Sequence, residues 1–311
     1  MRMFRRTAIA TMAVAALALS ACAGEASQKE EEKEQLQEEV GAYSMEQAAE
    51  VPDGLIKEIK DRGYLTVGVK FDQPLIGQQN SANGKIEGFD AEMARLLTQR
   101  IFGEVKEGDE GNLRFVETTS ENRETYINDG TVDVVIASYS MYPERLESFD
   151  FAGPYFYTGQ NVMVAADNTD ITSVADLSGK KVCIAEGSGS IGNLEKENPE
   201  ADITTLKDYA ACAESLKTGG HDAVSTDETI LYGFVSGEPD TFKVLDSSIN
   251  FSDEPYGIAM KFGETDARMF MNDMIQESYD NGDWSKAFAL TFGAAQMPEP
   301  DFPEIDRYEA K

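Results

Sequence analysis

Apolar and polar positions alternate along most of the chain after residue 64, and the period of the alternation changes from segment to segment. Residues 65–69 alternate apolar with small or polar side chains, which is typical of a strand. A helix that Asp90 could cap is predicted next, because its apolar positions lie three and four residues apart, at Met93, Leu96, Leu97 and Ile101. A strand at 113–117, a helix at 123–128 and an apolar strand at 132–137 follow. This order predicts an α/β fold with a mostly parallel sheet.

A second body is predicted to begin between Tyr157 and Gly159, because residues 161–165 start a fresh alternation. Its further elements are a helix before Ser178, a strand at 181–185, a helix after a glycine-rich turn, a strand at 223–225 and a helix from Glu228. A returning strand at 258–261 and helical patterns at 266–279 and 284–292 complete the chain. We therefore expect two lobes: residues 51–158 together with 257–311, and residues 159–256. Each should hold a central sheet flanked by helices.

Three loops are candidates for a site, because ligands of open parallel sheets bind beyond the carboxyl ends of the strands. They are residues 138–145, 186–190 and 226–227, and we expect them to share one cleft between the lobes.

The N-terminus has the pattern of an export signal. Arg2, Arg5 and Arg6 precede about a dozen small or apolar residues, a stretch too short to cross a bilayer as an ordinary helix. Residues 19–22, Leu-Ser-Ala-Cys, resemble the lipobox of bacterial lipoproteins, in which cleavage leaves a lipid on the cysteine, here Cys22. Ordinary secretion is the alternative. Residues 23–50 are rich in glutamate and are predicted to form an acidic tether.

The charge and the cysteine and histidine content exclude several classes of binding partner. The chain has 57 acidic and 27 basic residues and a formal charge of −30, so nucleic acid and anionic membrane surfaces are poor partners. Cys183 and Cys212 are expected to form a disulfide in an exported chain, with two buried free thiols as the alternative. The single histidine, His221, makes a zinc site improbable, and neither a metal nor a cofactor is expected.

A set of ordered motifs resembles the polar amino-acid-binding proteins of ABC importers, the solute-binding proteins of family 3. The likeness spans about residues 63–292, and its motifs are Gly88-Phe-Asp-Ala-Glu-Met-Ala94, Ser120-Glu-Asn-Arg123, Ser140-Met-Tyr-Pro-Glu-Arg145 and Glu186-Gly-Ser-Gly189. It implies a two-lobed fold of the periplasmic-binding-protein type II, with two hinge strands and closure around one free amino acid. Residues 67–74 look closest to the glutamate-binding lipoproteins of that family.

The resemblance places the α-carboxylate of the ligand on Arg145, whose planar guanidinium matches two carboxylate oxygens. A surface ion pair with Glu144 is the alternative for this arginine. By family match, Ser138 and Ser140 contact the same end of the ligand, and Ser188 and Gly189 complete the carboxylate site from the second lobe, at the start of a helix. A plain turn is the alternative for this glycine-rich loop.

Asp227 matches the carboxylate that pairs with the ligand's ammonium in the family, although an aspartate there could merely cap the helix from Glu228. Ser120 and Arg123 resemble the residues that contact the distal carboxylate of acidic ligands. Lys70 stands where relatives with acidic ligands carry a basic residue. Together they predict glutamate, with aspartate as a further candidate. Salt bridges within or between the lobes are the alternative for Lys70 and Arg123.

The function predicted from these residues is that of a receptor without catalysis, anchored by lipid to the outer face of the bacterial cytoplasmic membrane. It would bind an amino acid and deliver it, as a monomer, to the permease subunits of an importer. The rival is an enzyme on the same two-lobed fold, such as a cyclohexadienyl dehydratase.

Overall fold

The computed structural model describes residues 41–295 and 297–307. The predicted signal at 1–22, with Cys22, and the predicted tether up to residue 40 lie outside the described residues. No helix within the described ranges is long and apolar enough to cross a membrane.

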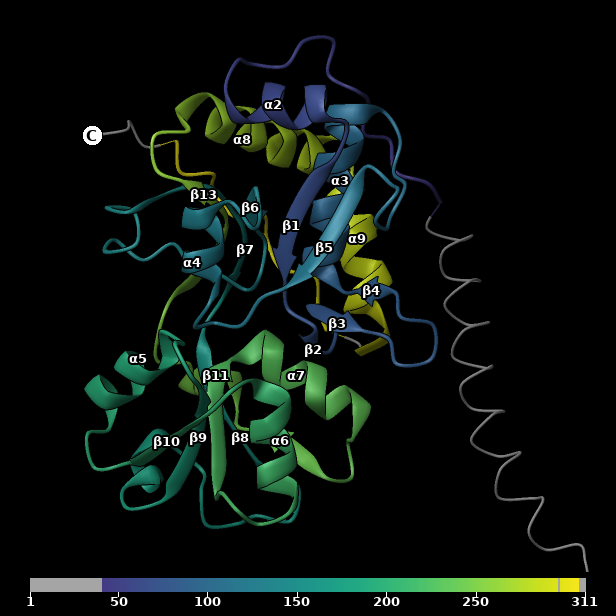
Figure 1. The fold of residues 1–311 in the computed structure, drawn as a ribbon. Helices are drawn as coiled ribbons and strands as arrows, with labels where there is room; N and C mark the ends of the chain where they lie inside the picture. Colours follow the sequence, from purple (N-terminus) through teal and green to yellow (C-terminus); the bar gives the residue numbers. More distant parts are fainter. Residues whose placement is uncertain (1–40, 296, 308–311) are drawn as a thin grey trace, which may run out of the picture. The chain divides into compact units, whose positions relative to one another are not determined.

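The first lobe is built on a five-stranded sheet of order β5-β1-β6-β13-β7. Its strands are β1 (Leu65–Val69), β5 (Leu113–Glu117), β6 (Val134–Val135), β7 (Phe149–Thr158) and β13 (Glu254–Lys261). Helices α3 (Phe89–Phe102), α4 (Arg123–Asp129) and α8 (Thr265–Asp280) pack on it, and α9 (Asp283–Thr291) packs on α3 and α8 (Figure 1). Helix α2 (Leu55–Arg62) and a small sheet of β2 (Asp72–Gln73), β3 (Gly77–Gln79) and β4 (Ile86–Glu87) complete this lobe.

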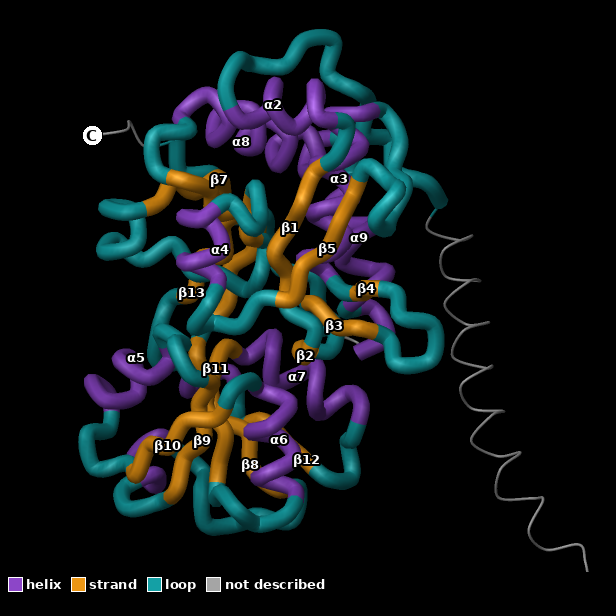
Figure 2. Tube along the Cα trace, viewed as in Figure 1, coloured by secondary structure: helices purple, strands orange, loops and turns teal. Residues whose placement is uncertain are grey.

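The second lobe is built on a sheet of order β10-β9-β11-β8-β12. Its strands are β8 (Gln160–Ala165), β9 (Lys181–Ala185), β10 (Asp202–Leu206), β11 (Ala223–Asp227) and β12 (Phe242–Val244). Helices α5 (Ser190–Glu197), α6 (Tyr209–Lys217) and α7 (Glu228–Gly237) pack on this sheet, as Figure 2 shows. Short 3-10 helices cover Val174–Leu177, Ser247–Ile249 and Gly293–Ala295.

The two-lobed α/β fold is confirmed, but both sheets are mixed and not mostly parallel. In the first sheet β13 pairs antiparallel with β6 and β7, and in the second β8 pairs antiparallel with β11 and β12. The chain passes between the lobes after Thr158 and returns before Glu254, and these two residues pair in the antiparallel ladder of β7 and β13. The return therefore comes earlier than the predicted residue 257, and the two crossing strands form the hinge.

The apolar run at 132–137 is buried as predicted, but only a short part of it forms a strand. Val134, Val135, Ile136 and Ala137 are fully buried, yet only the first two belong to β6. The apolar run reports burial on both faces, whereas the backbone leaves the ladder and reaches the left-handed region at Ser138, with φ 44°. The turn at Ser138 directs the following residues, which are also buried, away from the end of β6.

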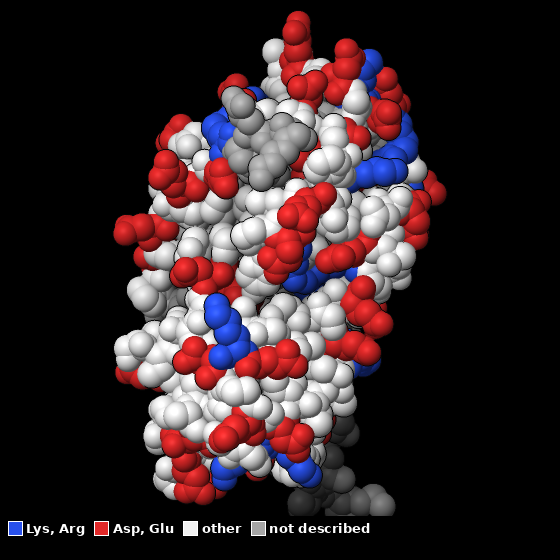
Figure 3. All heavy atoms as spheres, turned by 90° about the vertical axis from the view of Figure 1, so that its left-hand side faces the viewer, with Lys and Arg blue, Asp and Glu red and all other residues white. Residues whose placement is uncertain are grey.

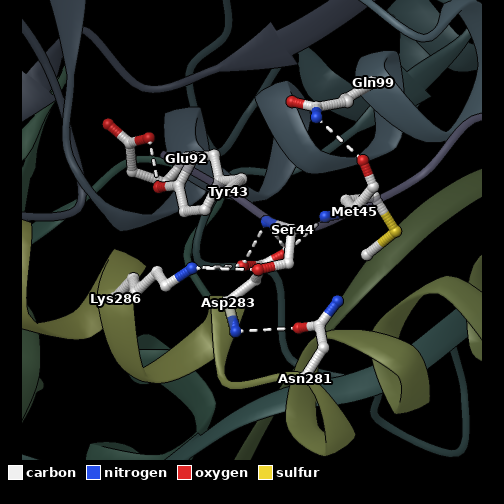
Figure 4. A network of polar contacts seen from close by, with 8 residues as sticks. All are labelled: Tyr43, Ser44, Met45, Glu92, Gln99, Asn281, Asp283 and Lys286. Carbon is white, nitrogen blue, oxygen red and sulfur yellow. Dashed lines mark hydrogen bonds and ion pairs between the residues drawn. The ribbon is translucent and has the colours of Figure 1, made fainter. Parts of the chain in front are cut away.

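The predicted tether is shorter than expected at its C-terminal end, because the chain is bound to the first lobe from Tyr43 onward (Figure 4). The backbone N–H groups of Ser44 and Met45 donate to the buried Asp283 carboxylate at 2.7 Å each. The Tyr43 hydroxyl donates to Glu92, and Gln99 donates to the Met45 carbonyl. This segment thus joins α9 to α3.

The expected disulfide between Cys183 and Cys212 is present. It links β9 to α6, and both cysteines are fully buried. The strand that leads into the predicted loop at 186–190 is thereby joined to the helix whose first residue, Tyr209, donates to Ser188.

Candidate functional site

Both lobes line one small cavity, and the three predicted loops meet in it. Its lining residues are Ser120, Arg123, Ser138, Ser140, Tyr142, Arg145, Ser188, Gly189, Ser190, Tyr209, Thr226, Asp227, Ile230 and Glu254. Eight of the predicted site residues are among them. The ninth, Lys70, lies just behind, where its Nζ donates to the Ser120 hydroxyl at 2.8 Å.

Two arginines share one aromatic ring at the first-lobe side of the cavity. The guanidinium carbon of Arg123 lies 3.7 Å from the centre of the Tyr139 ring, and that of Arg145 lies 4.5 Å from it. Arg145 is also 4.4 Å from the Tyr142 ring and donates to the Ser140 carbonyl at 2.8 Å. Stacking on rings orients a guanidinium and leaves its in-plane N–H groups available for a ligand.

Burial makes these cations costly. Lys70 and Arg123 are almost fully buried, and burial, followed by the charge of Arg123, lowers the pKa of Lys70 to about 7. Burial and the charge of Arg145 lower the pKa of Arg123 to about 10. The Nε of Arg123 is buried without a hydrogen-bond partner among the described residues.

None of the three cations, Lys70, Arg123 and Arg145, forms an ion pair with a carboxylate in the part of the chain that the structure describes. The alternative of structural salt bridges, including one from Arg145 to Glu144, therefore has no support there. Buried charges are normally paired, so three buried or half-buried cations without a partner mark a place for an anion. The outer surface is very different, because Figure 3 shows many acidic and few basic side chains on the face it views.

A buried carboxylate lies at the second-lobe side. Asp227 ends β11 and stands directly before α7, yet its side chain makes no capping bond to that helix. It accepts instead from the Tyr256 hydroxyl at 2.6 Å. Burial, and then the charge of Glu254, raise the pKa of Asp227 well above its usual range. The capping role is thus not supported, and a cationic ligand group near Asp227 would relieve both effects.

The sequence analysis missed Glu254, a second buried carboxylate in the cavity. It accepts from the hydroxyls of Tyr142 at 2.7 Å and Ser252 at 2.6 Å, from the Asn193 amide at 2.8 Å and from the Ser140 hydroxyl. The available signal was its place: a charged residue at the start of the returning strand, where the chain crosses between the lobes.

The lobes contact each other beside the cavity. Asn193, on α5 of the second lobe, donates to the Tyr142 hydroxyl at 3.0 Å, and the Tyr209 N–H of α6 donates to Asp72 at 2.9 Å. Gly189 is needed here, because a Cβ at this position would lie 2.4 Å from the Tyr142 ring. The absence of a side chain lets the ring close over the glycine-rich loop.

The predicted serines differ in how they face the cavity. Ser138 hydrogen-bonds through its hydroxyl to Gln73 and to the Ala137 carbonyl, and its N–H donates to Asp90 at 2.7 Å. Asp90 therefore holds this loop and does not cap α3, whose N-cap is Gly88. The Ser188 hydroxyl accepts from Tyr209 at 2.8 Å.

No cluster of three or more His, Cys, Asp and Glu side chains that could hold a metal occurs in the described ranges. Most of the side chains that line the cavity carry a charge or a hydroxyl group, which suits the capture of a small polar molecule.

A family model of the bacterial extracellular solute-binding proteins, family 3, matches residues 65–294. The chain belongs to this family. It is 38% identical over 253 residues to a glutamine-binding protein of Geobacillus stearothermophilus, covering 80% of this chain and 90% of that protein. It is 30% identical over 298 residues to the glutamate-binding protein GluB of Corynebacterium efficiens, covering 94% and 92%.

Among solved structures, the chain resembles the ancestral amino acid-binding protein AncCDT-1, a precursor of cyclohexadienyl dehydratase, with a TM-score of 0.68 and 26% identity over 77% of this chain and all of that one. The curated relatives are transport binding proteins and not enzymes. The family 3 protein described here is accordingly a solute-binding protein of an ABC amino-acid transporter, which delivers its ligand to the permease.

Proposed function

We propose that the protein binds L-glutamate in the cavity between its lobes. The observation that carries this proposal is the set of three cations that have no carboxylate partner among the described residues, in an otherwise acidic protein. Arg145 would hold the α-carboxylate, while Lys70 and Arg123, steadied by Ser120, would hold the distal carboxylate. Asp227 would pair with the ammonium. Ser188 and Gly189 would complete the site around the α-carboxylate, and Ser138, whose N–H and hydroxyl already donate to Asp90 and Gln73, would hold the loop beside it.

The two relatives carry the names of different ligands, glutamine and glutamate, so the charges of the site must decide between them. Glutamine would bring a neutral amide to Lys70 and Arg123 and leave their charges uncompensated. Glutamate would supply a second carboxylate, and its charge would offset the cost of burying these cations. The same logic admits aspartate only if its shorter side chain reaches both groups.

Titration calorimetry tests the proposal on protein produced without residues 1–22. We expect one site for L-glutamate and at least tenfold weaker binding of L-glutamine. The Lys70→Met variant should lose most of this preference, while Lys57→Met, a change at an exposed lysine of the first lobe, should keep it. Equal affinity of the wild type for the two amino acids would remove the role given to Lys70 and Arg123.

The same titrations should reveal proton uptake that glutamate causes and glutamine does not. With a pKa of about 7, Lys70 is only partly protonated in the ligand-free site at neutral pH. A carboxylate beside it raises that pKa, so glutamate binding takes up protons and weakens as pH rises above 7. Buffers with different ionisation enthalpies measure the uptake, and equal uptake with both ligands would contradict this assignment.

We also propose that Cys22 carries a lipid and that residues 23–42 tether the lobes to the membrane. The sequence of residues 19–22 supports this proposal, as does the export pattern before it. A Cys22→Ser variant should be recovered free of membranes, whereas the wild type should sediment with them. Equal partition of the two would exclude the anchor.

A further inference from the structure

Glu254 is the carboxylate with the most hydrogen bonds in the cavity, and its donors come from three parts of the chain. Ser140 and Tyr142 lie in the loop after β6, Asn193 lies on α5, and Ser252 precedes β13. The backbone fixes this arrangement, because Ser140 and Tyr256 form an isolated β-bridge and the Met141 N–H donates to the Pro255 carbonyl at 2.8 Å. Glu254 and Ser140 are therefore held side by side.

The direction of each hydrogen bond follows from the number of protons that each group carries. The Asn193 amide nitrogen only donates, and it donates to both Glu254 and the Tyr142 hydroxyl. The Tyr142 hydroxyl thus accepts from Asn193 and has its single proton left for Glu254. The Ser140 hydroxyl also has one proton, which it gives to Glu254.

We propose that Glu254 sets the orientation and the specificity of ligand binding by fixing the Ser140 hydroxyl as a hydrogen-bond acceptor. With its proton committed to Glu254, Ser140 can offer only lone pairs to the cavity. An ammonium can donate to it, whereas a carboxylate, which only accepts, is repelled. Ser140 then belongs to the ammonium end of the site and not, as the sequence led us to expect, to the carboxylate end.

The position of Asp227 agrees with this assignment. Tyr256 stands two residues after Glu254 on β13, so both side chains point to the same face of the strand. Tyr256 donates to Asp227, and Glu254 receives the proton of Ser140. Strand β13 thus carries one of the two carboxylates and contacts the other. Asp227 would pair with the ammonium directly, whereas Glu254 would act on it through the Ser140 hydroxyl. Glu254 is a positioning residue in this arrangement.

The inference rests on the proposed function, and a comparison of two ligands tests it. Glutarate is glutamate without its α-amino group. We expect Glu254→Gln to reduce the ratio of the glutarate to the glutamate dissociation constant at least tenfold, mainly by weakening glutamate binding. Ser140→Ala should reduce the ratio similarly. In this variant the Glu254 carboxylate keeps its other donors, Tyr142, Asn193 and Ser252. The ratio should fall little further in the double variant than in either single variant, because both changes remove the same Ser140–Glu254 hydrogen bond.

Asp72→Asn is the matched control, since it weakens the contact that Asp72 makes with the Tyr209 N–H of the other lobe and touches neither Ser140 nor Glu254. It should weaken both ligands by a similar factor and leave the ratio unchanged. Equal weakening of glutamate and glutarate by Glu254→Gln would overturn the inference, as would additive effects of the Ser140 and Glu254 changes. If the wild type does not bind glutamate, the proposed function fails by itself. The ratio is then measured with the amino acid that does bind and its deaminated analogue.

Discussion

Replacing Arg145 with alanine is expected to weaken amino-acid binding by about 2–5 kcal/mol, or roughly 30-fold to several thousandfold. The guanidinium lies in the cavity between the rings of Tyr139 and Tyr142, and it has no carboxylate partner in the described part of the chain. Without it, the α-carboxylate of the ligand would lose water and gain no charged partner. Calorimetry with the ligand of the wild type measures the loss.

Two further arginine variants make this result specific. Arg145→Lys keeps the charge but loses the planar fork, so its affinity should fall between those of the wild type and the alanine variant. Arg62→Ala removes an arginine that pairs with Asp133 at the surface of the same lobe, and it should bind like the wild type. Unchanged affinity of Arg145→Ala would mean that the α-carboxylate is held elsewhere.

Asp227→Asn should cost a similar 2–5 kcal/mol, because the ammonium would be buried without its ionic partner. The pH dependence should change as well. Burial and Glu254 raise the pKa of Asp227, while Tyr256, Arg123 and Arg145 lower it. An ammonium lowers it further, so binding releases a proton at acid pH, and the wild-type affinity falls as pH drops through the raised pKa. In the asparagine variant this acid limb should be absent.

Dissociation constants measured between pH 4 and pH 8 would show the limb, with the fold of each variant checked by circular dichroism. Asp202→Asn, an exposed change on β10, serves as the control and should keep both the affinity and the acid limb. An acid limb that persists in Asp227→Asn would assign the titration to another group.

The sequence predicted most of the elements whose side chains face a core, although it missed helices α2 and α6. Helix α3 could be found because its apolar positions are all buried on one side. Strand β10 was missed, because it lies at the edge of its sheet with most of its side chains exposed or half-buried, and an edge strand shows little apolar alternation. The antiparallel strands of the two sheets could not be predicted either, because the hydrophobic pattern of a segment does not report the direction in which its strand runs.

The site divides in a similar way. The loop from Ser138 to Arg145 follows a buried strand, and its motif could be read directly. Glu254 could not be assigned, because three of its four donors, Ser140, Tyr142 and Asn193, lie more than fifty residues away in sequence. The direction of the Ser140 hydroxyl depends on that long-range contact. Sequence motifs name residue types, whereas donor and acceptor roles arise from the complete network.

The attachment of Tyr43, Ser44 and Met45 to Asp283 and to α3 has a mechanical consequence (Figure 4). A pull on the N-terminal end of the chain enters the first lobe through these bonds and bypasses the crossing strands. With the anchor proposed above, the first lobe would be the fixed one, and the second could move relative to it without loading this attachment.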